Sequence, residues 1–241
     1  MKLGVKTFED GNFLRHFKDK ADFFEVMAIQ EADYSFLKEF NLPLVIHAQH
    51  QNFNINNADK TKIKENTDSI NFAISLANEY KADKIIIHPG EITDKNCSIE
   101  QAISFFKSIK DKKVLIENLL GHKTGLCATP EEIKIFLKET KTKFCFDINH
   151  AIETAVYLNE NYIDFIKKFI ELKPAHYHLG GQNIKQKKDH INFKESDIDL
   201  KKILELIPKN AEITLEVSTD IEKTKEDLEL IRNYIKNFES T

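Results

Sequence analysis

The chain has 241 residues, of which 41% are hydrophobic and 31% are charged, and its formal net charge is −4. Mixed charges with a small acidic excess are not the composition of a general nucleic-acid-binding protein. No apolar run approaches the roughly 20 residues of a membrane span, and the first residues lack the basic, apolar and small-residue regions of a signal peptide, so we expect a cytoplasmic protein without a membrane partner.

Eight short segments rich in β-branched and aromatic residues are predicted to be strands. In chain order they are residues 2–6, 22–28, 43–48, 83–89, 113–118, 143–148, 175–180 and 212–218. Segments between and after them repeat apolar residues at a spacing of about three to four positions, which predicts helices. These are residues 12–20, 31–40, 59–80, 98–110, 129–140, 151–172, 198–207 and 221–238.

Eight strand-then-helix units predict an α/β protein, a single (β/α)₈ TIM barrel with a parallel eight-stranded core. Single barrels of this kind commonly occupy about 250 residues, so we expect one domain over residues 1–241. An open doubly wound sheet would carry a glycine-rich phosphate loop after its first strand, and the segment after residue 6 does not supply one.

Six consecutive predicted strands end in or next to an imidazole or a carboxylate. These residues are His47, His88, Glu117, Asp147, His178 and Glu216. An Asp after an apolar run is often only a helix N-cap, which could explain Asp147, but His is a poor cap. Because the carboxyl ends of barrel strands meet at one mouth, the six side chains are expected to lie close together.

A ring of imidazoles and carboxylates without a partnering Arg favours a divalent cation as the counter-charge. The three cysteines, Cys97, Cys127 and Cys145, show no Cys-x-x-Cys spacing, so neither a thiolate zinc site nor a disulfide framework is indicated. Oxygen and nitrogen ligands suit Zn²⁺, Mn²⁺, Mg²⁺ or Fe²⁺, and the choice among them stays open.

Seven segments resemble the xylose isomerase-like TIM barrels, the superfamily that includes endonuclease IV and the ketose 3-epimerases. In order they are VIHAQHQNF, IIIHPGE, LIENLLGH, FCFDINHA, HYHLGGQN, DHINF and TLEVS, and they span essentially the whole chain. The resemblance implies four shared metal ligands, Glu117, Asp147, His178 and Glu216. It further implies that His47, His88, His150 and His190 match positions that bind additional zinc ions in the nuclease, although many isomerase-like members keep some of these histidines too.

The first functional interpretation of this resemblance is an isomerase or epimerase of a sugar, sugar phosphate or related polyol. A metal would polarise the substrate carbonyl, and Glu117 and Glu216 would act as the acid/base pair around an enediolate. The alternative for these two residues is metal ligation alone. Expected substrate contacts are His50, Asn183, Lys185 and Asp189. The family places an Arg directly after the Asn, whereas this chain has Ile184 there and Lys185 at the next position.

The second interpretation is a zinc phosphodiesterase that resembles endonuclease IV and cleaves DNA at abasic sites. This chain departs from that family in having Asp189 and His190 adjacent, where the family writes Asp-Arg-His. Base-step insertion uses apolar wedges, whereas Gln49, His50 and Gln51 are polar, and no basic loop cluster is evident in the sequence. A third class is a binding or regulatory barrel without turnover, because a fold never proves a reaction.

Three further residues carry weaker expectations. Glu25 either lines the mouth or fills the barrel interior, since Phe24 and Val26 should point the opposite way. His176 lies two positions before His178 and is expected to be a hydrogen-bonded interior residue. His122 is expected at the surface.

Overall fold

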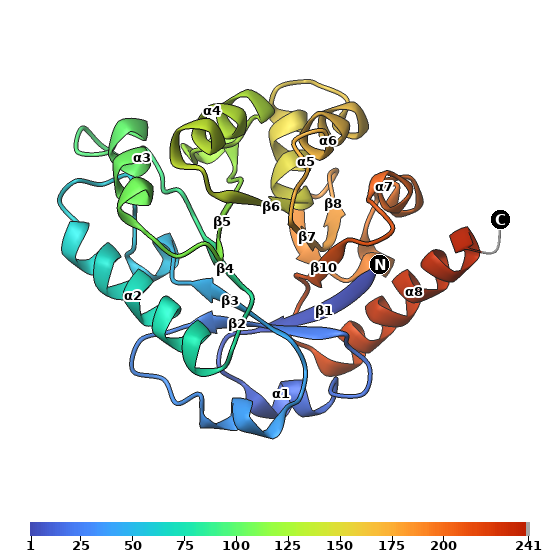
Figure 1. The fold of residues 1–241 in the computed structure, drawn as a ribbon. Coiled ribbons are helices and arrows are strands. Elements are labelled where there is room, and N and C mark those ends of the chain that lie inside the picture. Colours follow the sequence, from blue (N-terminus) through green and yellow to red (C-terminus); the bar gives the residue numbers. More distant parts are fainter. Residues whose placement is uncertain (240–241) are drawn as a thin grey trace.

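Eight parallel strands close into a barrel, which confirms the predicted fold class (Figure 1). The computed structural model describes the backbone of residues 1–239 and the side chains of residues 1–122 and 124–237. Around the barrel the strands are β1 (Lys2–Thr7), β2 (Phe23–Ala28), β3 (Leu44–Ala48), β4 (Lys84–Ile87), β5 (Val114–Glu117), β6 (Lys143–Asp147), β7 (His176–Leu179) and β10 (Glu212–Leu215). β10 pairs with β1 and closes the ring.

Helices surround the barrel on its outside (Figure 1). They are α1 (Gly11–Arg15), α2 (Ile63–Glu79), α3 (Ile99–Ser108), α4 (Pro130–Thr140), α5 (Ile148–Tyr157), α6 (Tyr162–Ile170), α7 (Leu200–Leu206) and α8 (Ile221–Glu239). Short 3₁₀ turns are η1 (Ser35–Glu39), η2 (Gln51–Phe53), η3 (Gly121–Lys123) and η4 (Phe193–Glu195). Within the described chain, no helix combines the length and apolar character needed to cross a membrane.

The structure corrects two of the predicted elements and adds a hairpin that was not predicted. Residues 31–40 form only the 3₁₀ turn η1, so the second crossover has no α-helix. The predicted helix 151–172 is two helices, because Asn159 adopts a left-handed backbone with φ 56° and Asn161 caps α6 by accepting from Ile163 and Asp164 N–H. An antiparallel hairpin of β8 (Gly181–Asn183) and β9 (Lys188–Ile191) follows β7 and is absent from the prediction.

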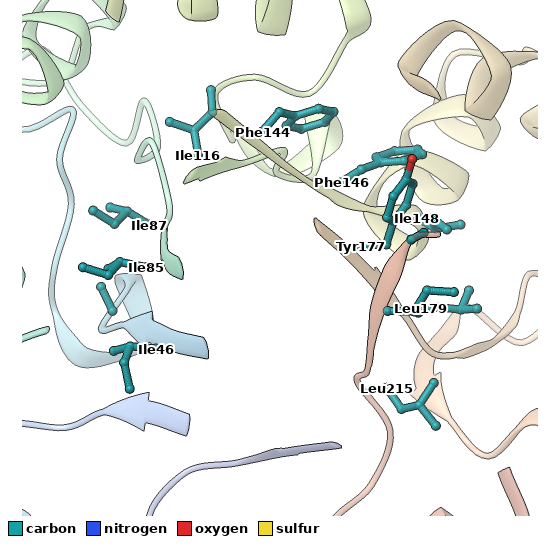
Figure 2. Close-up of a cluster of buried hydrophobic side chains, with 14 of the residues drawn as sticks. Ile46, Ile85, Ile87, Ile116, Phe144, Phe146, Ile148, Tyr177, Leu179 and Leu215 are labelled. Carbon is teal, nitrogen blue, oxygen red and sulfur yellow. The ribbon is translucent and has the colours of Figure 1, made fainter. Parts of the chain in front are cut away.

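Side chains alternate along each strand between the helix-covered outside and the barrel interior. The outward set is apolar and fills the space beneath the helices, as Figure 2 shows for Ile46, Ile87, Phe146 and Leu179. The inward set includes a separate apolar layer of Phe23, Val45, Ile86, Leu115 and Cys145.

Gly4 makes room for this inner layer. A Cβ at Gly4 would lie 2.3 Å from the Phe23 ring, closer than atoms can pack. The layer fills the barrel below the mouth, so the polar residues at the carboxyl ends of the strands surround a site with a closed floor.

Candidate metal centre

A cavity of about 590 Å³ opens at the carboxyl ends of the strands. Among its lining residues are His47, His88, Glu117, His150, His190 and Glu216. β4 and β10 end immediately before His88 and Glu216, so these two side chains come from the first loop residues and not from the strands as predicted. Residues distant in sequence therefore meet in one pocket, as the strand-end pattern predicts.

Four residues, Glu117, Asp147, His178 and Glu216, form what we call the inner cluster. One ligand atom from each lies within 4.8 Å of the others. Nδ1 of His178 is 3.1 Å from Oε1 of Glu216 and 3.4 Å from Oε1 of Glu117. Glu117, Asp147 and His178 are at most 1% exposed. Three carboxylates and one imidazole thus face a common point inside the protein.

Two further groups adjoin the inner cluster and share a carboxylate with it. The outer cluster is His47, His88 and Glu117, and the third cluster is Asp147, His150 and His190. Nε2 of His47 and of His88 lie 3.1 and 3.4 Å from Oε2 of Glu117. Glu117 belongs to the inner and outer clusters and Asp147 to the inner and third, so three neighbouring groups of donors that could hold a cation overlap through two carboxylates.

Each of the five histidines in these clusters has one ring nitrogen facing a protein oxygen. The pairs are His47 Nδ1 with Ala48 O at 2.8 Å, His88 Nδ1 with Gln51 Oε1 at 3.1 Å, His150 Nδ1 with Asn118 O at 2.8 Å, His178 Nε2 with Glu25 Oε2 at 3.1 Å, and His190 Nδ1 with Asp189 Oδ2 at 3.5 Å. An oxygen acceptor holds the proton on that nitrogen, so in His47, His88, His178 and His190 the lone pair is on the other nitrogen, which faces a cluster carboxylate. Metal-binding histidines are oriented in this way. In His150 the nitrogen paired with Asn118 O is also the one nearest Asp147, at 3.6 Å.

Unpaired buried atoms test whether a cation fits. Within the described part of the chain, Oδ2 of Asp147 and Nδ1 of His178 are buried without a hydrogen-bond partner, and they lie 4.0 Å apart. A buried anionic oxygen without a donor is costly unless positive charge lies beside it, and either a proton on His178 Nδ1 or a bound cation supplies that charge. The residues present therefore fit a divalent cation with nitrogen and oxygen ligands. Burial raises the pKa of the adjacent Cys145 thiol to about 12, so a neutral thiol stands there.

The electrostatics of the inner cluster also favour a cation. Burial would raise the pKa of Glu117, but the imidazoles of His178 and His88 lower it well below its ordinary value. Burial likewise opposes protonation of His178, yet the surrounding carboxylates of Glu216, Glu25 and Glu117 raise its pKa well above the ordinary value. The carboxylates are thus held anionic, and positive charge is favoured where Nδ1 of His178 points.

Asp147 is the helix N-cap weighed from the sequence, and its second oxygen remains directed at the clusters. Its Oδ1 accepts from the backbone N–H of His150 at 2.8 Å and caps α5. Its Oδ2 faces the inner and third clusters. The helix cap thereby fixes the direction of the potential ligand atom.

The predicted substrate contacts fall into two groups. His50 lines the pocket, stacks on His88 with ring centroids 4.7 Å apart, and has its pKa lowered to about 2 by burial and by His88. Asn183 and Lys185 lie outside the pocket lining. The Asn183 side chain donates to Glu195 O and accepts from Gln186 N–H, so it builds the hairpin turn.

Asp189 lies behind His190, and the adjacency of the two residues has a geometric explanation. His190 adopts a left-handed backbone with φ 50° at the irregular end of the hairpin. Its Nε2 then points to Glu216 Oε2 at 3.1 Å, while Nδ1 faces Asp189. The hydrogen bond from His190 lowers the pKa of Asp189. His190 is the member of the pair that joins a cluster.

Lys6 is a site residue absent from the sequence analysis. Its Nζ contacts Glu216 Oε1 and lies 3.2 Å from Glu25 Oε1. The carboxylate ring therefore does have one basic partner, contrary to the expectation of a ring balanced by metal alone. Lys6 is the inward residue of β1 in register with Glu25 on β2, and this pairing of opposite charges is the signal that could have revealed it.

Glu25 and the remaining histidines agree with the interior and surface expectations. Glu25 is 0% exposed, and its Oε2 contacts His178 from inside the barrel, so the interior alternative is confirmed. His176 is fully buried and hydrogen-bonds Thr214 Oγ1 at 2.8 Å, as predicted. His122 is exposed.

Comparisons with known proteins agree with this architecture. The family model described as xylose isomerase-like TIM barrel matches residues 2–234. The uncharacterised protein MJ1614 of Methanocaldococcus jannaschii is 24% identical over 234 residues, covering 84% of this chain and 89% of that protein. A D-tagatose 3-epimerase-like structure covers 100% of both chains with a TM-score of 0.77 and 18% identity. Endonuclease IV from Thermus thermophilus covers 98% of this chain and 100% of its own, with a TM-score of 0.74 and 16% identity.

Proposed function

This chain belongs to the xylose isomerase-like TIM barrel family, and on that premise we propose that it is a divalent-metal-dependent phosphodiesterase acting on DNA at abasic sites. The observation that carries this proposal is the overlap of three donor clusters through Glu117 and Asp147. An isomerase of this family needs the inner cluster alone, whereas two or three adjacent cations are the arrangement of phosphoester-hydrolysing sites.

The chain's own residues have separate tasks in this proposal. Cations bound there would activate water and neutralise the charge of a phosphate. Glu117 and Asp147 bridge neighbouring clusters, while His47 and His88 each offer an Nε2 lone pair fixed by a hydrogen bond at Nδ1. His150 adjoins Asp147 through Nδ1 at 3.6 Å. Orientation by an outer partner reduces the freedom that each ligand loses on binding.

Contrary to the expectation that the chain has no basic loop cluster, the β8–β9 hairpin next to the pocket carries three lysines. Lys185, Lys187 and Lys188 are exposed on it, and none of the three ammonium groups forms an ion pair with a residue whose side chain is described. Nearby Lys194, by contrast, pairs with Glu226 at 2.7 Å. The same hairpin carries His190 into the pocket. Unneutralised lysines next to a phosphate-hydrolysing site suit a substrate with a phosphate backbone.

A second candidate is the isomerase or epimerase of a sugar or sugar phosphate, and one observation favours it. At the positions where the nuclease inserts side chains into DNA, this chain has polar side chains that already form hydrogen bonds. Gln49 Oε1 accepts from Ser69 Oγ at 3.4 Å, and Gln51 Oε1 is 3.1 Å from His88 Nδ1. These residues offer no apolar group to insert between bases. In this candidate Glu117 and Glu216, on either side of His178 Nδ1, would be the acid/base pair.

One set of measurements separates the two candidates. Metal content of the purified protein is measured for wild type, His88→Ala (outer cluster) and His150→Ala (third cluster). Each protein is then assayed for nicking of a duplex with one abasic site and for proton exchange from a ketose in heavy water. The phosphodiesterase predicts two or three cations in wild type and loss of nicking in both variants. One cation, no nicking and ketose exchange retained by both variants would overturn it in favour of the isomerase.

A further inference from the structure

A column of four polar side chains descends through the barrel interior beneath the metal centre. We call Glu25, Thr214, His176 and Lys84 the interior column. Thr214 Oγ1 is 2.7 Å from Glu25 Oε2 and 2.8 Å from His176 Nε2. His176 Nδ1 is 3.1 Å from Lys84 Nζ, which also binds Glu212 Oε2 at 2.5 Å near the opposite end of the barrel. Glu25, Thr214 and His176 are each 0% exposed.

The hydrogen bonds of this column have only one consistent direction. An ammonium group donates and never accepts, so His176 Nδ1 must accept from Lys84. The proton of the neutral imidazole is therefore on Nε2, which donates to Thr214 Oγ1. The hydroxyl of Thr214, with one proton of its own, is then directed to Glu25 Oε2.

The opposite direction would leave buried groups unsatisfied. A proton on His176 Nδ1 would face the Lys84 ammonium as a second donor. His176 Nε2 would then accept from Thr214, whose hydroxyl would turn away from Glu25. Each mismatch leaves a buried polar atom without its partner, which destabilises the folded protein.

The end of the column contacts a proposed metal ligand. Glu25 Oε2 accepts from both Thr214 and His178 Nε2, the latter at 3.1 Å, and Glu25 Oε1 is 3.2 Å from Lys6 Nζ. Oε2 thus holds two hydrogen bonds and Oε1, which has no hydrogen-bond partner among the described residues, faces the Lys6 charge, so rotation of the Glu25 carboxylate and of the His178 ring is restrained. Nδ1 of His178 then points its lone pair into the inner cluster.

We propose that Lys84, His176 and Thr214 are positioning residues that set the cation affinity of the inner cluster by orienting His178 through Glu25. The inference rests on the proposed metal centre but not on which reaction it performs. Lys84 does not line the mouth pocket, so any effect of Lys84 on the metal must pass through the column. Partners of this kind behind a ligand typically change metal affinity by about 10- to 100-fold.

The experiment measures Zn²⁺ affinity by chelator competition, together with the visible spectrum of the Co²⁺-loaded protein. Thr214→Val removes the hydroxyl but keeps the side-chain shape, and Lys84→Met removes the donor but keeps the stem. Both are expected to weaken the tightest site about tenfold or more and to alter the Co²⁺ spectrum. Lys2→Met is the matched control, because Lys2 also binds Glu212 but is exposed and outside the column.

Two substitutions of His176 distinguish a hydrogen-bonding role from a role in filling space. His176→Gln retains one donor and one acceptor and should keep affinity near wild type, whereas His176→Leu should lower it as Lys84→Met does. Circular dichroism confirms that each variant is folded. Wild-type affinity in folded Thr214→Val and Lys84→Met, or equal affinity in the two His176 variants, would overturn the proposal.

A second measurement tests the interior column even if the protein binds no metal. In ¹⁵N-histidine-labelled protein without metal, Nε2 of His178 should carry a proton in wild type and Lys2→Met, and its signal should shift in Thr214→Val and Lys84→Met. An unchanged signal in the last two variants refutes the column. Absence of Zn²⁺ binding by the wild type would instead refute the proposed function.

Discussion

The ammonium group of Lys6 lies 3.2 Å from Oε1 of Glu25 and also contacts Glu216, so one cation at the end of β1 links the barrel interior to the inner cluster. The two carboxylates and His178 otherwise depend on a bound ion for their charge balance. Lys6 therefore offsets part of the negative charge of the site in every metal state.

Lys6→Met should lower the stability of the chelator-treated protein by about 3 kcal/mol, because breaking a buried ion pair leaves its carboxylates uncompensated. Added Zn²⁺ should then raise the melting temperature of the variant more than that of wild type. Thermal unfolding with and without metal measures both effects. Lys225→Met, which breaks an exposed pair with Glu222, is the control and should leave the stability nearly unchanged. Equal stability of wild type and Lys6→Met in chelator would contradict the role assigned to Lys6.

Sequence patterns predicted the barrel because apolar residues on both faces of its strands give near-continuous apolar runs, as at Ile85 to Ile87, where only Ile86 faces inward. They also located the strand ends that surround the mouth. Two residues with a role at the site were not predicted from the sequence, for the same physical reason. Lys6 and Thr214 are polar residues on strands that show ordinary alternation, and their roles arise from neighbours on other strands.

Local backbone geometry accounts for the remaining differences. The β8–β9 hairpin is short and polar, so no hydrophobic period marks it. His190 reaches the pocket only through its left-handed backbone, which the sequence spacing with Asp189 did not indicate. The apolar spacing continues through residues 151–172, but the chain forms two helices there. Asn159 ends the first with a left-handed backbone, and Asn161 caps the start of the second.

Asp189 should affect the cation affinity of the third cluster only. Asp189→Ala removes the acceptor facing His190 Nδ1, so the affinity of the third cluster should fall by about 10- to 100-fold while the inner and outer clusters keep theirs. Metal stoichiometry at a limiting Zn²⁺ concentration measures this. Asn183→Ala perturbs the same hairpin without touching His190 and controls for loss of hairpin shape. A loss of all cations, or an equal loss in Asn183→Ala, would show that Asp189 is not a specific partner of His190.

The hairpin lysines should govern the salt dependence of DNA binding. Replacing Lys185, Lys187 and Lys188 together by Ala should weaken duplex binding and flatten the slope of log affinity against log salt by about two to three. Fluorescence anisotropy over a range of salt concentrations measures the slope. Lys209→Ala is the control, since Lys209 lies in the loop before β10 at the opposite end of the barrel. An unchanged slope in the triple variant would remove the hairpin from the proposed DNA-contacting surface.

Asp227 should make the protein less stable as the pH rises. This carboxyl is 0% exposed, its Oδ1 accepts from Asn192 Nδ2 and Phe193 N–H, and its Oδ2 has no hydrogen-bond partner among the described residues. Burial raises its pKa to about 6 from 3.8. The folded state therefore binds this proton more tightly than the unfolded state, so the group's stabilising contribution is complete below about pH 4 and is lost as the pH rises to about 6.

The loss should be on the order of 1 to 3 kcal/mol. Urea unfolding in chelator from pH 4 to 7 should show that Asp227→Asn lacks this loss, because the amide has no charge to bury. Asp164→Asn is the control with the opposite sign. The hydrogen bond from Lys167 lowers the pKa of the exposed Asp164 carboxyl, so its stabilising contribution weakens as the pH falls. Parallel pH profiles for wild type and Asp227→Asn would mean that Asp227 is ionised in the folded protein throughout this range.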